Sequence, residues 1–175
     1  MEADKVKERK LTRLEALDEY KVADDDPDVR GWAFVGNDGS HLGVVDSLIV
    51  DQEAEKVRYL DVKLDKAFTH SDSDRHILVP IGLAKVHEDK DEVLLNEIDR
   101  SVLLDCPIYR GDGVTLDYEH ALVEKLGTAT KNNPFRGTIA KNPSDFYSYN
   151  YYDMESFYCP RRNKATEELR DIGKS

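Results

Sequence analysis

Cysteine is scarce in this chain: Cys106 and Cys159 are the only two in 175 residues. Neither belongs to a CxxC pair, so the sequence supports neither a zinc site nor a redox motif of that type. A single disulfide between them remains open, but two reduced thiols in a cytosolic protein are the preferred interpretation.

Long apolar runs are also missing. No segment approaches the roughly 20 apolar residues that a transmembrane helix needs. Residues 1–20, MEADKVKERKLTRLEALDEY, lack the apolar centre of a signal peptide. We therefore expect a soluble, cytoplasmic protein without membrane insertion.

The chain has no excess of basic charge. Lys and Arg number 25 against 36 Asp and Glu, which gives a net charge of −11 and a pI near 4.9. Nucleic acid and anionic membranes carry the same sign, so the composition disfavours both as partners. With 35% charged residues and a mean hydropathy of −0.63, the chain is expected to be very soluble. Its length suits one domain with extensions.

Motifs for catalysis and cofactor binding are absent from the sequence. It contains no GxSxG, P-loop or GxGxxG motif. The glycine-rich GNDGSHLG stands between two strand-like segments, as a hairpin does. His70 and His76 flank Asp72 and Asp74, but a solvated loop explains this spacing better than a metal site does. We therefore expect no catalytic residue, no metal and no cofactor, in a protein that is not an enzyme.

The first pattern present in the chain is helical. Leu11, Leu14 and Leu17 recur at three-residue spacing among charged residues, which predicts a helix over residues 4–19. The acidic segment Asp24–Asp28 then predicts a solvated turn that ends the helix.

From Gly31 onward the pattern is typical of β-strands. GWAFVG and LGVVDSLIVD flank the turn sequence NDGS, which predicts a hairpin. Gly43 inside the second strand indicates a bend or a close backbone approach. Pro80 and Gly82 interrupt HILVPIGLAKV, so this strand lies at an edge, is bulged, or turns a corner. VLLNEI and SVLLDCPIY follow, and this spacing of short segments predicts a β-barrel or sandwich, with the Gly and Pro positions favouring the barrel.

One strand, KVRYLDVKLD at residues 56–65, changes its alternation phase. Val57 and Tyr59 lie on one phase, whereas Leu60 begins an apolar series on the other. A bulge near Tyr59 and Leu60 would explain the change, because a bulge inserts one residue into a strand.

Arg58 lies at this change of phase. One interpretation makes it a buried functional cation. The preferred interpretation is a structural ion pair with an acid such as Asp46 or Asp61 at the barrel wall, because such pairs commonly explain buried arginines.

The chain after Arg110 has a different character. LDYEHALVEKLG predicts a helix at about 116–127, with Asp117 at its N-cap and Gly127 at its C-cap. The segment at residues 146–159, FYSYNYYDMESFYC, holds five of the nine tyrosines. Packing of this arm on its own barrel and a homo-oligomer contact are weighed equally, and base stacking fits less well because few basic residues are interleaved. The interface candidates are Tyr147, Tyr149, Tyr151, Tyr152, Phe157 and Tyr158.

Several segments together resemble the PRC-barrel family, named after the cytoplasmic domain of the photosynthetic reaction centre H subunit. The resemblance is carried by D-x-R-G-W from Asp28, by LGVVDSLIVD, KVRYLDV and RHILVPIGLAKV, and by CPIY. It implies a mainly β fold, with a small, highly bent barrel at 28–109. An N-terminal helix and acidic turn at 1–27 and a helical and irregular extension at 110–175 would flank it. The barrel positions it implies are Arg30, Gly31, Trp32, Gly39, Gly43, Arg58, Tyr59, Pro80 and Gly82.

The resemblance implies docking to other proteins rather than a reaction. We therefore predict a non-enzymatic interaction module that self-associates and has an unknown protein partner. A small-molecule or quinone and redox-cofactor binder is the first alternative, although none of the acidic and histidine residues with which the H subunit delivers protons can be matched here. A ribosome- or RNA-associated factor is the second, because a ribosome-maturation factor shares the domain, and the acidic charge disfavours it.

Overall fold

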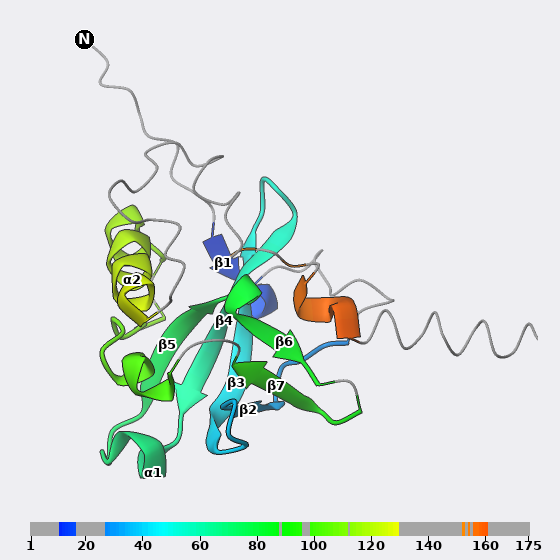
Figure 1. The fold of residues 1–175 in the computed structure, drawn as a ribbon. Helices are drawn as coiled ribbons and strands as arrows, with labels where there is room; N and C mark the ends of the chain where they lie inside the picture. The colour runs from blue at the N-terminus through cyan, green and yellow to red at the C-terminus, as the bar shows by residue number, and fades with distance from the viewer. Residues whose placement is uncertain are drawn as a thin grey trace, which may run out of the picture.

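A single curled β-sheet organises the protein (Figure 1). The computed structural model describes residues 11–16, 27–87, 89–95, 99–111, 113–129, 152, 154 and 156–160. The strands are β1 (Leu11–Arg13), β2 (Ala33–Val35), β3 (His41–Asp51), β4 (Lys56–Leu64), β5 (Arg75–Pro80), β6 (Ala84–Val86) and β7 (Glu92–Leu95). Their order is β5-β4-β3-β2-β7-β6, and β1 pairs with β3 off this path. The sheet forms a half-barrel with a few short helices, which confirms the predicted mainly β fold class.

The turn between β2 and β3 has the predicted hairpin structure. Gly39 has a φ of +82°, a conformation that glycine adopts without steric cost. The Gly36 amide donates to the Ser40 carbonyl at 2.9 Å, and the Asp38 carboxylate accepts from the Ser40 amide at 3.0 Å. Just before β2, Gly31 has a φ of +88° and donates its amide to the Val45 carbonyl at 2.7 Å. The two glycines therefore set the entry and the exit of β2.

Gly43 lies where β3 and β4 approach most closely. A Cβ atom at this position would come within 2.2 Å of the Lys63 carbonyl oxygen and 3.0 Å of the Leu64 Cα. Real side chains do not approach backbone so closely, so only glycine fits here. The predicted close backbone approach is confirmed.

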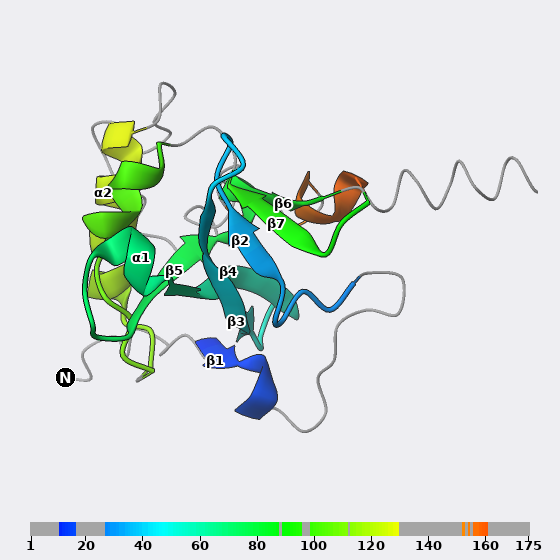
Figure 2. The same cartoon turned by 90° about the horizontal axis from the view of Figure 1, so that it is seen from below.

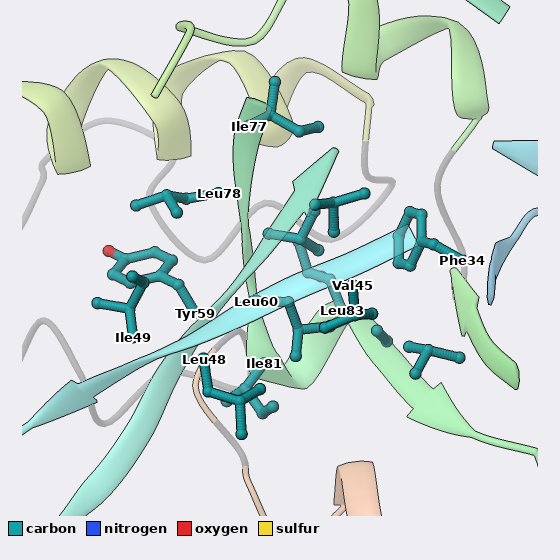
Figure 3. Close-up of a cluster of buried hydrophobic side chains, with 14 of the residues drawn as sticks. Phe34, Val45, Leu48, Ile49, Tyr59, Leu60, Ile77, Leu78, Ile81 and Leu83 are labelled. Carbon is teal, nitrogen blue, oxygen red and sulfur yellow. The ribbon is translucent and has the colours of Figure 1, made fainter. Parts of the chain in front are cut away.

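Strand β4 contains the predicted bulge, displaced by one position. Ile49 pairs with Tyr59 and Val50 pairs with Val57, so Arg58 is the extra residue on β4. Residues 58–62 are buried without interruption, which shows that both faces of this part of β4 are covered. Tyr59 and Leu60 therefore lie on opposite sides of the strand and are both in apolar surroundings (Figure 3). The change of alternation phase in the sequence therefore marks a strand that is buried on both faces.

The interrupted segment HILVPIGLAKV turns a corner. β5 ends at Pro80, the 3₁₀ helix η2 follows at Ile81–Leu83, and β6 begins at Ala84. β6 then pairs with β7, which runs parallel to β2 and continues the curl of the sheet (Figure 2). Two of the three interpretations open for this segment are observed, because it turns a corner and because β5 and β6 are the two end strands of the sheet order.

The predicted N-terminal helix is wrong over the described residues 11–16. Leu11–Arg13 form β1, antiparallel to residues 49–51 at the end of β3, and Leu14–Ala16 form the 3₁₀ helix η1. β2 pairs with only the first half of this edge of β3, which leaves the second half open to another strand. Hydrogen bonds to β3 therefore decide the local structure of residues 11–13. Residues 4–10, 17–19 and 24–26 of the predicted helix and turn lie outside the described residues.

Besides η1 and η2, three further helical segments connect or cover the strands. They are α1 (Lys66–Thr69), the 3₁₀ helix η3 (Arg100–Leu104) and α2 (Leu116–Ala129). The apolar segment SVLLDCPIY thus begins in a helix, which the Asp99 side chain caps by accepting from the Ser101 amide at 2.9 Å.

Helix α2 confirms the predicted helix and corrects both predicted caps. The Thr115 hydroxyl accepts from the Tyr118 amide at 3.1 Å, so Thr115 caps the helix and Asp117 lies in its first turn. Gly127 lies inside the helix, which continues to Ala129. The helix stands beside β5 and buries Leu122, Val123 and Leu126 (Figures 1 and 2).

The C-terminal arm is part of the core. Tyr152, Phe157 and Tyr158 are buried in the same hydrophobic cluster as the strands and α2. These three interface candidates are therefore covered within their own chain, whereas Tyr147, Tyr149 and Tyr151 lie outside the described residues. The two cysteines form no disulfide with each other, and Cys106 is buried whereas Cys159 is exposed. Within the described part of the chain, none of the helices has the length and apolar character needed to cross a membrane.

Candidate functional site

Four charged side chains from four strands meet at one side of β4. Arg13 comes from β1, Asp46 from β3, Asp61 from β4 and His76 from β5. His76 Nδ1 lies 2.8 Å from Asp61 Oδ1 and 4.0 Å from Asp46 Oδ2. Arg13 Nη2 lies 2.8 Å from Asp46 Oδ2 and 3.7 Å from Asp61 Oδ2. We call these four residues the ionic cluster.

Strand register brings the acids and the histidine of the cluster together. Asp61 pairs with Leu78 and Lys63 pairs with His76. Asp61 and His76 are therefore diagonal neighbours on one face of the sheet. Asp46 is the extra residue at a register shift in β3, between positions that pair with Val62 and Asp61. A bulge re-aims a side chain, and here a carboxylate oxygen of Asp46 lies within 4.8 Å of one from Asp61.

Arg13 reaches the cluster from β1. It pairs with Ile49 on β3, three residues beyond Asp46. The backbone pairing of β1 holds the base of the side chain, and the guanidinium extends back to the two acids.

Asp61 is the buried member of the ionic cluster. Its exposed fraction is 0%, and its Oδ1 atom accepts from His76. Its Oδ2 atom is also buried and has no hydrogen-bond partner. Burial raises the pKa of this carboxyl group, although His76 and Arg13 both act to lower it. The folded chain therefore holds a carboxylate whose charge is only partly compensated.

A pocket of about 450 Å³ opens on this cluster. Its lining residues are Arg13, Asp61, Asp74, His76, Ile108, Tyr109, Arg110 and Gly111. Ile108 is 46% exposed and is the exposed large hydrophobic residue among those the structure describes. The pocket is thus lined by charged side chains together with the exposed apolar side chain of Ile108. The segment after η3, which the sequence did not mark as functional, supplies half of this lining.

A buried hydrogen-bond chain joins the sheet to the C-terminal arm. The Tyr59 hydroxyl donates to Glu119 Oε1 of α2 at 2.9 Å and accepts from the Tyr152 hydroxyl at 2.8 Å. The rings of Tyr59 and Tyr152 also meet edge to face, with centroids 5.4 Å apart. Tyr59 is therefore the point where β4, α2 and the arm are held together.

Arg58 forms an ion pair with an acid, as the preferred interpretation expects, but this acid is Asp51. Its Nε and Nη2 atoms lie 3.3 and 3.2 Å from Asp51 Oδ2, and the side chain is almost fully buried. Asp51 pairs with Lys56 at the end of the hairpin, close to Arg58 in the register. The two predicted partners, Asp46 and Asp61, are held by Arg13 and His76 instead.

Sequence reasoning missed the ionic cluster. Its members lie far apart along the chain, and no short spacing joins them. Acids inside apolar strands, Asp46 and Asp61, were the available signal. Of the pair His70 and His76, which the sequence placed in or beside a polar loop, only His76 belongs to the cluster; His70 lies at a second pocket of about 400 Å³.

Cys106 is a buried thiol, as the sequence indicated. Burial raises its pKa to about 12, and its Sγ atom donates to the Val102 carbonyl at 3.4 Å. A thiol in this state is a poor nucleophile.

Comparison with protein families agrees with the observed fold. The PRC-barrel domain model matches residues 22–102. The matched region contains β2–β7 and three members of the ionic cluster, and it differs from the predicted 28–109 by a few residues at each end. Residues 22–102 of this chain are therefore a PRC-barrel domain.

Proposed function

We propose that this protein is a non-enzymatic interaction module that binds a protein partner at the pocket over the ionic cluster. The observation that carries the proposal is Ile108, an exposed large hydrophobic residue at the wall of a charged pocket. A hydrophobic side chain beside charged groups provides both burial and orientation for a docking partner.

Binding fits this pocket better than catalysis does. Among its lining residues there is no serine, threonine, cysteine or lysine that could act as a nucleophile. Asp61 and His76 bind each other, and Arg13 binds Asp46 and lies 3.7 Å from Asp61. The charged side chains of the ionic cluster are thus largely paired with one another.

The docking proposal can be tested by capture from the native cell with the full-length chain as bait. We expect Ile108→Ser and Arg110→Glu to remove a partner that the wild-type chain retains. Arg100→Glu is the matched control, because Arg100 is also an exposed arginine but lies at the second pocket. Equal capture of the same partner by all four baits would contradict docking at this pocket.

Self-association is a second candidate function, and the packing of the C-terminal arm favours it. Tyr152, Phe157 and Tyr158 are buried in the hydrophobic cluster that also contains the strands. The connection from α2 to Tyr152 has about twenty residues, which can span roughly 70 Å when extended. Such an arm reaches the same seat on a second copy, and exchange of identical arms is a low-cost route to a dimer.

Light scattering distinguishes exchange from packing within one chain. Exchange predicts a mass above the monomer's 20.0 kDa for the wild type and a smaller dimer fraction for Tyr152→Ala. A mass of one chain for both proteins, with only the Tm lowered in the variant, would show that the arm packs on its own barrel.

The other two alternatives have less support. A quinone site needs a mostly apolar cavity, whereas five of the eight residues lining the pocket over the ionic cluster are Asp, Arg or His. An RNA-binding role is still opposed by the net charge of −11.

A further inference from the structure

We infer that Asp46, Asp61 and His76 bind a divalent transition-metal ion of the zinc type, and that Arg13 is the internal cation that this metal displaces. The inference goes beyond the docking function, because metal binding by the purified chain needs no partner. One ligand atom from each of the three residues lies within 4.8 Å of the others.

The donor set selects the class of metal. One imidazole nitrogen with two carboxylate oxygens suits zinc and its neighbours, whereas calcium and magnesium prefer oxygen ligands only. Zinc binds these atoms at about 2.0–2.2 Å in a tetrahedral arrangement, which places two of its ligand atoms roughly 3.4 Å apart. The ligand atoms of the three residues lie within 4.8 Å of one another, so side-chain rotation must bring them closer for an ion to bind.

A second observation independently indicates a missing ligand. Asp61 Oδ2 is buried without a hydrogen-bond partner, and the nearest cation, Arg13 Nη2, is 3.7 Å away. A buried charged oxygen without a partner is costly, and coordination to a metal is one of the few arrangements that satisfy it. The pocket beside Asp61 and His76 gives an ion access from solvent.

In this structure the guanidinium of Arg13 lies beside the two carboxylates that would bind the metal ion. Its guanidinium contacts Asp46 at 2.8 Å and approaches Asp61 from a strand of only three residues. A divalent ion brings twice the charge to the same carboxylates. When it binds, His76 Nδ1 becomes a ligand and the ring carries its proton on Nε2. Arg13 then returns to solvent, where its charge is hydrated.

The first experiment measures Zn²⁺ binding to the metal-free, tag-free full chain by calorimetry, and Co²⁺ binding by visible absorption. We expect one equivalent of each ion to bind. His76→Gln and Asp61→Asn should weaken binding on the order of tenfold or more, since ligand shells respond on this scale. Asp46→Asn gives the same test at an exposed position, where folding is not at risk.

His41→Asn is the matched control for these variants. His41 also pairs with an aspartate, Asp65, but it belongs to no group of three ligands among the described residues. Unchanged Zn²⁺ binding by this variant is expected. Equal loss in His41→Asn and His76→Gln would contradict a site at the ionic cluster.

The Arg13→Gln variant provides the decisive measurement. If Arg13 competes with the metal, its removal should tighten Zn²⁺ binding several-fold or more, whereas a purely structural ion pair predicts no gain. The absence of saturable Zn²⁺ and Co²⁺ binding in both wild type and Arg13→Gln would overturn the inference. It would leave the docking proposal standing, because partner capture is scored with Ile108 and Arg110.

Discussion

At the scale of single residues, Gly43 decides whether β3 and β4 can pair. The Lys63 carbonyl occupies the space in which any side chain at position 43 would begin, only 2.2 Å from an ideal Cβ. This obstacle is backbone in a long central hairpin, so it cannot move aside as a side chain would. The requirement for glycine is therefore steric and does not depend on its φ angle.

We predict that Gly43→Ala lowers the free energy of unfolding by about 2 kcal/mol or more, because overpacking forces the backbone to shift. Gly113→Ala is the control, since a Cβ there meets nothing within 4 Å. Its effect should stay within about 0.5 kcal/mol. Urea denaturation of the three proteins measures both values, and equal stability of the two variants would contradict the steric explanation.

The two cysteines differ in reactivity for a reason that is also local. Cys159 is exposed, whereas Cys106 is buried with a pKa raised to about 12. At pH 8 only about one Cys106 thiol in ten thousand is ionised at that pKa, and the thiolate is the reactive form. We predict that a thiol reagent labels one site in the native chain and two in urea. Cys159→Ser should then show no rapid native labelling, and rapid labelling of this variant would disprove the assignment.

At the scale of elements, both faces of β4 are buried, and Tyr59 links this strand to the helix and the arm that pack against it. The hydroxyl of Tyr59 contacts Glu119 of α2 and Tyr152 of the arm. Neither the helix nor the arm belongs to the region that matches the PRC-barrel domain. The C-terminal extension therefore helps to bury β4, one of the two strands of the central β3–β4 hairpin.

We predict that Tyr59→Phe costs about 1–3 kcal/mol, because it removes a donor from a buried carboxylate. Tyr152→Phe should cost less, since Tyr59 still donates to Glu119 in that variant. Thermal and urea unfolding of the single and double variants measure the coupling between the two hydroxyls. A larger loss for Tyr152→Phe than for Tyr59→Phe would contradict the proposed order of the hydrogen bonds.

At the scale of the whole molecule, the barrel and its extension share one core. Residues of α2 and the arm lie in the same hydrophobic cluster as β3, β4 and β5. The boundary at residue 110 drawn from the sequence therefore separates the recognisable family region from the rest of the chain, but it does not separate two packing units.

Truncation tests this view of the molecule. We predict that a chain ending at Arg110 exposes the outer face of β4, binds a hydrophobic dye and loses its cooperative thermal transition. A chain ending at Pro160 keeps all the core residues that the structure describes and should retain the wild-type Tm. An unchanged, cooperative transition in the shorter chain would show that the barrel folds alone.

The sequence predicted those features that depend on neighbours along the chain. The NDGS turn, the close approach at Gly43, the interruption of the strand at Pro80 and the helix after Arg110 all follow from local rules, and the structure confirms them. The N-terminal helix failed under the same rules, because leucine spacing does not reveal that the edge of β3 lies open to Leu11–Arg13.

The sequence by itself determined the fold class and the course of the hairpins, since alternation, glycine and proline act within a few residues of themselves. Only the tertiary structure decided which charges meet. Arg13, Asp46, Asp61 and His76 come from four strands, and strand register together with a bulge places their atoms within a few ångströms. Charged groups carry no local signal of their partners, because their pairing depends on the folded sheet and on the water that it excludes.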